Sequence, residues 1–305
     1  MWYYVKDKLA VNALVYNFMP SWWNRNYGVE FGEKCVFDAD YRVQLYRFME
    51  RELSLRFKSL HIGDESPEPS VVPPDFGNAV TAAAAGCEVS YPIDNYPWNK
   101  HLDDENISRL KVPHDLEDVF PYCEIIKQFR YLNSKFDKNV TPYVGIRGVL
   151  NDALLIKGHE LLADCCTKEE SAQKLLDYSY SMLAATLRLN KDKLKWRGTP
   201  VLMNCTVMMA GPRVYKNYLH SYDLNAYELA SSMGLDFGLH HCGVFDGFSQ
   251  IYRSFYKVSF LEIGWGSDLK STFAFYPEAV VQFIYSPTFL LGAGVNDVRN
   301  ATNAL

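Results

Sequence analysis

The feature that most constrains the fold is an alternation of short apolar segments with helical segments, from about residue 60 to the end of the chain. Strands that alternate with helices, without consecutive hairpins, are typical of α/β proteins with a parallel sheet. We expect strands at 60–63, 87–91, 142–146, 200–205, 237–240, 259–263 and 280–285. This series suits a TIM-type (β/α)8 barrel better than two Rossmann halves, and no G-x-G-x-x-G or Walker-type glycine loop occurs. We therefore predict one TIM-barrel domain over residues 1–305, with allowance for an incomplete or atypical last strand.

An aromatic-rich extension, about residues 1–35, precedes this pattern. Its residues Trp22, Trp23 and Tyr27 are expected to pack across a surface or between two copies of the chain. A homodimer is therefore among the expected assemblies.

Two long helices are predicted from apolar residues at helical spacing. The first follows a cap at Asp38 or Asp40, and its apolar face holds Tyr41, Leu45, Phe48, Met49 and Leu53, with Arg42, Arg47, Glu50 and Arg51 toward water. The second covers 168–189, with a stripe of Ala172, Leu175, Leu176, Ser179, Met182 and Leu183. Both helices are expected to pack one face against a core.

The composition excludes several classes of protein. A formal net charge of −5, without a Lys/Arg-rich run, argues against nucleic-acid binding. No window approaches the roughly 18 uninterrupted apolar residues of a membrane span, so no membrane partner is expected. The seven cysteines are odd in number and scattered, which favours reduced thiols and a cytoplasmic protein.

The richest chemical feature is the stretch Gly238-Leu239-His240-His241-Cys242-Gly243. In an extended strand, His240 and Cys242 point to the same side and His241 to the other. Imidazole and thiolate are typical zinc ligands. The alternative is that the two side chains only pack at a strand end, because two ligands do not make a site.

Other candidates lie where the expected strands end, since catalytic residues of TIM barrels occupy the C-terminal strand ends. In chain order they are Asp64, Glu65, Tyr91, Asp94, Arg147, Asn151, Asp152, Asn204, Cys205, Glu262, Trp265 and Tyr285. Structural alternatives exist: Asp152 can cap a helix, Arg147 can pair with a carboxylate, and Cys205 can be an ordinary buried thiol. Glu262 lies in an apolar run, where a carboxylate is costly unless it is paired or metal-bound.

Several segments between about residue 60 and residue 292 form an ordered series. They are Thr141–Ala153 with Gly158–Leu162, Gly211-Pro212 with Tyr215, Tyr218 and Tyr222, Leu239–Gly243, Glu262–Leu269, and Ser286-Pro287 with Leu290–Gly292. In this order they resemble the uroporphyrinogen decarboxylase superfamily. The resemblance implies a TIM barrel and one of two chemistries.

The two branches of that superfamily differ in their motifs. Its decarboxylases work without a cofactor and carry an early Arg-Gln-Ala-Gly-Arg, which is absent here. Its cobalamin-linked methyltransferases bind zinc through His-x-Cys, which His240 and Cys242 match, and through a more C-terminal cysteine. That third ligand has no counterpart, because Cys242 is the last cysteine.

A second spacing favours the methyltransferase branch. Asp137, Cys165 and Cys205 are similar in spacing to a zinc pattern of enzymes that demethylate phenyl methyl ethers. We take this as support for the family more than for those three ligands. The chain thus resembles the methyltransferase I component of phenyl methyl ether O-demethylases.

The resemblance implies a zinc-dependent methyltransferase. It would move a methyl group from a small methylated substrate, plausibly an aromatic methyl ether, to the cobalt of cobalamin carried by a separate corrinoid protein. In this interpretation, His240 and Cys242 bind zinc, with Glu262 or Cys205 as the third ligand. Three aromatic residues contact the ring of the substrate: Tyr91, Trp98 and Trp265. Arg147 provides a cation at the rim, and Asn151, Asp152 and Asn204 contact polar groups of the substrate. The alternatives are a decarboxylase of a carboxylated ring compound and a non-catalytic barrel.

Overall fold

The computed structural model describes residues 17–167 and 170–303, and the chain forms two compact units. Unit 1 contains residues 17–80, 88–99 and 127–140, and unit 2 contains residues 81–87, 100–126 and 141–303. We describe each unit by itself. The single-domain assignment stays a prediction, and the first 16 residues of the expected aromatic extension lie outside the described residues.

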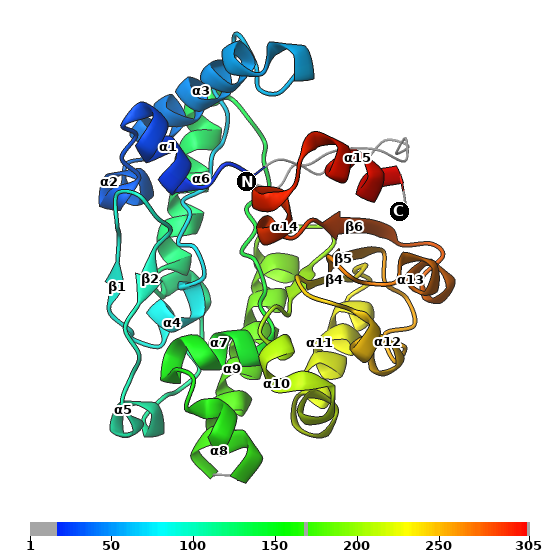
Figure 1. The fold of residues 1–305 in the computed structure, drawn as a ribbon. Coiled ribbons are helices and arrows are strands. Elements are labelled where there is room, and N and C mark those ends of the chain that lie inside the picture. The colour runs from blue at the N-terminus through cyan, green and yellow to red at the C-terminus, as the bar shows by residue number, and fades with distance from the viewer. Residues whose placement is uncertain (1–16, 168–169, 304–305) are drawn as a thin grey trace. The chain divides into compact units, whose positions relative to one another are not determined.

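Unit 1 is built mainly of helices. Its elements are α1 (Pro20–Tyr27), α2 (Gly32–Phe37), α3 (Ala39–Arg56), the 3₁₀ turn η1 (Lys58–Leu60), β1 (Val89–Ser90), β2 (Trp98–Asn99) and most of α6 (Tyr122–Phe136) (Figure 1). Asp38 caps α3, as predicted, by accepting a hydrogen bond from the Tyr41 amide at 2.9 Å. Trp23, Leu45 and Leu53 form a buried apolar cluster with Val29.

The expected solvent exposure of Arg42 is wrong. Arg42 is buried, and its guanidinium donates to the carbonyls of Cys35, Val36 and Val72 at 2.8–3.0 Å. It also donates to the side chain of Gln128. The charge is tolerated because several acceptors from separate segments replace water.

The first two expected strands are also corrected. Residues 60–63 form a turn in which His61 and Gly63 have φ values of 52° and 82°, a conformation incompatible with a strand. In the second, only Val89–Ser90 is extended, and it pairs antiparallel with Trp98–Asn99. The early chain therefore contains a hairpin where we expected parallel βα units.

Unit 2 contains a four-stranded parallel sheet. Its strands are β3 (Val201–Met203), β4 (Gly238–His241), β5 (Phe260–Gly264) and β6 (Val280–Ile284), in the order β3-β4-β5-β6. All four were expected from the sequence, with bounds shifted by a few residues. Leu239 and Leu261 face each other across β4 and β5 and are fully buried.

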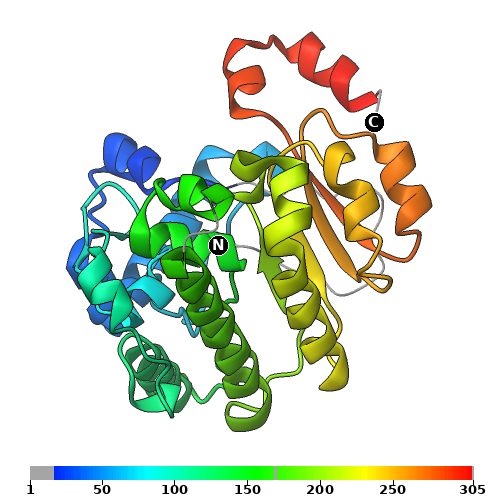
Figure 2. The ribbon, with the colours of Figure 1, turned by 90° about the horizontal axis from the view of Figure 1, so that it is seen from below.

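Helices connect and flank these strands (Figures 1 and 2). They are α7 (Val149–Lys157), α8 (Leu161–Thr167), α9 (Glu170–Arg188), α10 (Val207–Val214), α11 (His220–Ser232), α12 (Asp246–Tyr252), α13 (Leu269–Phe275), α14 (Pro287–Gly292) and α15 (Val295–Asn303). Two π-helical turns, η3 (Leu189–Lys193) and η4 (Tyr215–Leu219), extend α9 and precede α11. Shorter elements are α4 (Val80–Ala84), α5 (Asp104–Ser108) and η2 (Leu116–Asp118). The predicted stripe of α9 is buried throughout.

The expected strand at 142–146 is not formed. Only Arg147 makes a parallel bridge, to Met203 of β3. The Val144 amide donates to Asn190 Oδ1 at 2.9 Å, and Asn190 Nδ2 donates to the Val144 carbonyl at 2.7 Å. These backbone groups are therefore not free to pair with a strand. Over the part of the chain that the structure describes, the parallel sheet has four strands, and a complete barrel is not present.

No helix in residues 17–167 and 170–303 is both long enough and apolar enough to cross a membrane.

Candidate metal centre

A row of polar side chains crosses the unit 2 sheet. The register places His240 of β4 opposite Met203 of β3 and opposite Glu262 of β5, and Glu262 opposite Gln282 of β6. Side chains in register on neighbouring strands project from the same face of a sheet. The sheet therefore brings His240 and Glu262 together although they are far apart in sequence.

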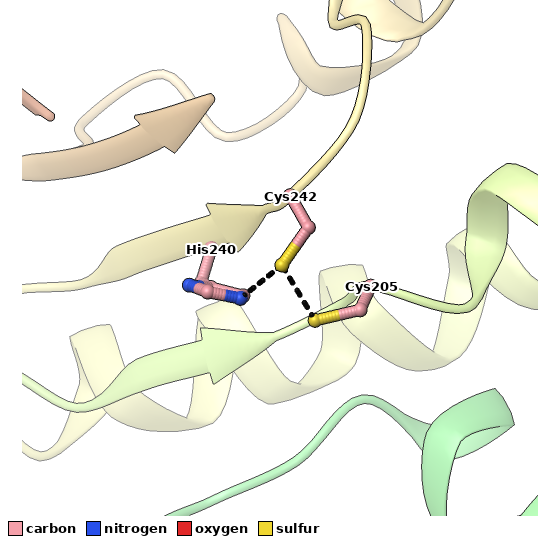
Figure 3. Close-up of side chains that lie close together, drawn as sticks. All are labelled: Cys205, His240 and Cys242. Carbon is pink, nitrogen blue, oxygen red and sulfur yellow. Dashed lines mark hydrogen bonds between the residues drawn. The ribbon is translucent and has the colours of Figure 1, made fainter. Parts of the chain in front are cut away.

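Three potential metal ligands converge at the C-terminal ends of β3 and β4 (Figure 3). The Cys242 sulfur lies 2.6 Å from Nε2 of His240 and 3.1 Å from the Cys205 sulfur. The ligand atoms of all three lie within 4.8 Å of one another. His240 and Cys242 share one face because strand side chains alternate, while Cys205 follows β3.

Glu262 contacts the other nitrogen of the imidazole. Its carboxylate lies against Nδ1 of His240, and its second oxygen accepts from Gln282 Nε2 at 2.7 Å. Glu262 is 1% exposed. A carboxylate in this place fixes the imidazole tautomer and ring orientation, which leaves Nε2 for a metal ion.

The three ligands share protons unequally. A hydrogen bond from the Cys242 thiol, helped by His240, lowers the pKa of Cys205 to about 4 despite burial. That same hydrogen bond to Cys205, together with burial, raises the pKa of Cys242. Burial opposes the charge on His240, but Cys205 and Glu262 outweigh it and raise the pKa of His240 to about 9. The group therefore favours a thiolate beside an imidazolium, and a divalent ion would displace the protons.

Hydrogen bonds hold the residues on both sides of Cys205. Asn204 is buried and donates to Asp223 Oδ2 at 2.5 Å. On the other side, the Thr206 amide and hydroxyl both donate to Oδ1 of Asn151, the amide at 3.0 Å. The predicted catalytic residues Asn151 and Asn204 thus position the loop that carries Cys205.

A buried network extends from Asn204. Asp223 also accepts from the Tyr215 hydroxyl at 2.8 Å, and the Tyr252 hydroxyl lies 3.3 Å from Asn204 Nδ2 and 3.0 Å from Nδ1 of His241. Burial raises the pKa of Asp223 to about 7, although both hydrogen bonds oppose this rise. His241 is fully buried among aromatic rings on the face opposite His240, in agreement with strand alternation.

Arg147 and Asp152 form a buried ion pair. Arg147 Nε donates to Asp152 Oδ1 at 3.0 Å, and both side chains are at least nine-tenths buried. Burial raises the pKa of Asp152, and Arg147 works against this. Arg147 also contributes to the low pKa of Cys205, so its charge acts at the candidate metal ligands.

The backbone after β4 is closely packed against β5. A side chain at Gly264 would place its Cβ 2.2 Å from the Cys242 carbonyl oxygen, so the position requires glycine. The Gly264 amide donates to the Gly243 carbonyl at 2.9 Å. This contact fixes the turn that directs the Cys242 sulfur toward Cys205.

The predicted aromatic contacts are divided between the two units. Trp265 follows β5 in unit 2, stacks on Phe289 at 4.4 Å and lies 5.1 Å from Tyr285. Tyr91 and Trp98 belong to unit 1, Tyr91 being half-buried and Trp98 exposed. Their shared ring contact stays a prediction.

The alternative spacing is not assembled into one ligand group. Of its three residues, only Cys205 belongs to the group of ligand atoms found among the described residues. Cys165 lies on α8, where burial raises its pKa to about 11, as expected of an ordinary buried thiol. Asp137 belongs to unit 1.

Several residues of the site were missed by sequence reasoning. They are Thr206, Asp223, Tyr252 and Gln282, which bind or orient the candidates, whereas Tyr215 was named in the resemblance without a role in the site. Asp223 carried one usable signal, an acidic residue on a helix face among apolar and aromatic neighbours. The others are common polar residues, and only the fold shows their partners.

Comparison with known proteins gives a structural likeness. No family model matches the chain, and no curated protein matches it. Among solved structures, the chain is similar to a methyltransferase from Methanosarcina mazei, with a TM-score of 0.66 and 16% sequence identity over 97% of this chain and 84% of that chain. At this identity the likeness shows a shared fold.

Proposed function

We propose that this chain is a zinc-dependent methyltransferase that transfers a methyl group from a small methylated substrate to the cobalt of a corrinoid carried by a separate protein. The single observation that carries the proposal is the convergence of Cys205, His240 and Cys242. Two thiols and an imidazole at this separation are a zinc-type donor set. The structural neighbour named as a methyltransferase adds support at the level of the fold.

The donor set fits a zinc ion with three protein ligands. Cys205, His240 Nε2 and Cys242 would bind it, and Glu262 would hold the Nδ1 proton of His240. Three ligands leave a fourth position open, which is typical of catalytic zinc. When bound, the ion would supply Lewis acidity toward the ether oxygen of the substrate, which makes a phenolate a better leaving group.

The remaining side chains would orient the substrate and shape the electrostatics. Arg147 carries a positive charge beside the thiolates and is held in place by Asp152. Trp265, stacked on Phe289, offers a rigid aromatic surface after β5. An aromatic methyl ether is the substrate class that combines a ring for such a surface with an oxygen for a Lewis acid.

Two further features belong to this proposal. We infer that the four-stranded parallel sheet, whose strands alternate with helices, is part of a TIM-type barrel with an atypical closing region. All seven cysteines are free, which supports a reducing, cytoplasmic environment.

A paired assay tests the function. Protein purified without chelator is expected to contain about one zinc per chain, and it is expected to consume a phenyl methyl ether only when a reduced corrinoid protein is added. Cys165→Ser is the matched control, because this thiol lies outside the ligand group. Absence of any transition metal, or release of CO₂ from a carboxylated ring compound without corrinoid, would overturn the proposal and favour a decarboxylase.

A further inference from the structure

Unit 1 contains a cavity of about 160 Å³ that has no role in the metal centre. It is bounded by α1, α2, α3 and the segment between β1 and β2. All the described residues that line it belong to unit 1, among them Trp23, Phe31, Leu45, Met49, Tyr91 and Tyr96. The cavity is therefore a feature of one compact unit.

The volume suits one aromatic ring. An apolar cavity of about 150 Å³, engineered into another protein, binds benzene. Natural ligand pockets share this character, with mainly apolar and aromatic walls and a few polar groups.

The walls are aromatic and held in place. Trp23 is 3% exposed and packs edge-on against Trp22 at 4.9 Å. Tyr91 is braced by Phe37 at 5.3 Å and by Phe76 at 6.5 Å. Rigid rings suit aromatic ligands because edge and face contacts add to apolar burial.

Three charged residues also line the cavity. Arg42, Glu50 and Asp75 line it, so two carboxylates accompany one guanidinium. The Arg42 guanidinium already donates to three backbone carbonyls and to Gln128. Moving a carboxylate-bearing ligand from water to mainly apolar walls would cost its hydration.

Two weakly polar groups complete the walls. Burial raises the pKa of the Cys35 thiol to about 11, and burial also raises the pKa of Tyr96. Both groups are therefore neutral near pH 7 and can meet a hydroxyl or ether oxygen. These two neutral groups favour an uncharged polar substituent on the ligand.

We propose that the unit 1 cavity is a binding site for one small uncharged aromatic molecule, a single ring with at most a hydroxyl or methyl ether substituent. The ring lies among Trp23, Met49 and Tyr91. This inference does not rest on the proposed methyl transfer, because none of the metal ligands lies in unit 1.

Isothermal titration of the full chain with methoxybenzene tests the site. We expect saturable binding of one molecule per chain and at least tenfold weaker binding of benzoate. Met49→Trp, which fills the cavity, is expected to weaken methoxybenzene binding at least tenfold. Leu55→Trp on the same helix is the control, because Leu55 is 55% exposed, and it is expected to bind like the unaltered chain.

A second measurement removes dependence on the folding of the variant. In the unaltered chain labelled with ¹³C-methyl methionine, the Met49 signal, assigned through Met49→Leu, is expected to shift on binding. His240→Ala is expected to keep full methoxybenzene affinity, which separates this site from the metal centre. No saturable binding, a Met49 signal that stays unmoved at saturation, or equal affinity of Met49→Trp and Leu55→Trp would overturn the proposal.

Discussion

Unit 1 and unit 2 both bury charged side chains, but they compensate the charges differently. In unit 1, the guanidinium of Arg42 is surrounded by neutral acceptors, three backbone carbonyls and an amide side chain. In unit 2, His240, Glu262 and Cys205 are ionisable groups that compensate one another. The hydrogen bonds of Arg42 tie three segments together, which is a structural role. Ionisable groups that share protons can release them when a metal ion binds. Groups with such perturbed pKa values are concentrated at functional sites.

The largest effect is expected from removing a metal ligand. Cys205→Ser, Cys242→Ser and His240→Ala should each lower zinc affinity at least a thousandfold, about 4 kcal/mol, because a two-ligand site remains. His241→Ala should retain zinc, since its side chain lies on the opposite face of β4. Competition with a chromogenic chelator measures the affinity. Equal loss in the His240 and His241 variants would show that the wrong histidine has been assigned.

The buried carboxyl of Asp223 should make stability depend on pH. Its pKa is about 7 in the folded protein against an ordinary value of 3.8, so the folded state binds this proton more tightly than the unfolded chain. The stabilising contribution is complete below about pH 4 and is lost as pH rises through about 7, at a slope of at most about 1.4 kcal/mol per pH unit.

Asp223→Asn isolates this contribution because it removes the titrating group. The difference in free energy of unfolding between the two proteins should change across pH 4 to 7 and stay flat above it. Urea denaturation at closely spaced pH values provides the measurement. A difference that is constant over the whole range would contradict the assignment.

Removal of the buried guanidinium of Arg42 in unit 1 should lower the free energy of unfolding and leave the zinc content unchanged. Arg42→Met leaves several buried acceptors without a donor, so we expect a loss of about 3 kcal/mol in the free energy of unfolding. Arg51→Met on the exposed side of α3 is the control and should change stability by less than about 0.5 kcal/mol. Zinc content should be unchanged in both. A loss of zinc in Arg42→Met would show that the two regions are not independent.

The smallest effect is expected at the residue that orients His240. Glu262→Gln keeps the shape but weakens the contact with Nδ1, so zinc affinity should fall about 10- to 100-fold. The pH dependence of zinc binding gives a second readout, because the pKa of His240 should fall when the carboxylate is removed. A loss as large as that of Cys205→Ser would instead identify Glu262 as a ligand.

Local patterns predicted local structure well. The cap at Asp38, the buried stripe of α9 and the strands β3 to β6 depend on neighbours a few residues away, and the structure has them. The strand at 60–63 failed because two of its residues adopt left-handed backbone conformations. The strand at 142–146 failed because one side chain, Asn190, takes the backbone groups of Val144. Apolar patterning carries no signal for either event.

The sequence by itself determined that His240 and Cys242 share one face and that His241 lies on the other, because side chains alternate along a strand. Only the tertiary structure shows where the two candidate third ligands lie. The parallel register puts Glu262 against Nδ1 of His240, while the turn after β3 brings the Cys205 sulfur to Cys242. It likewise decided that Arg42 is buried, because its acceptors come from residues distant in sequence. The spacing of residues along the chain predicts which side chains share a face of one helix or strand. Which side chains of different elements meet depends on strand register and on packing.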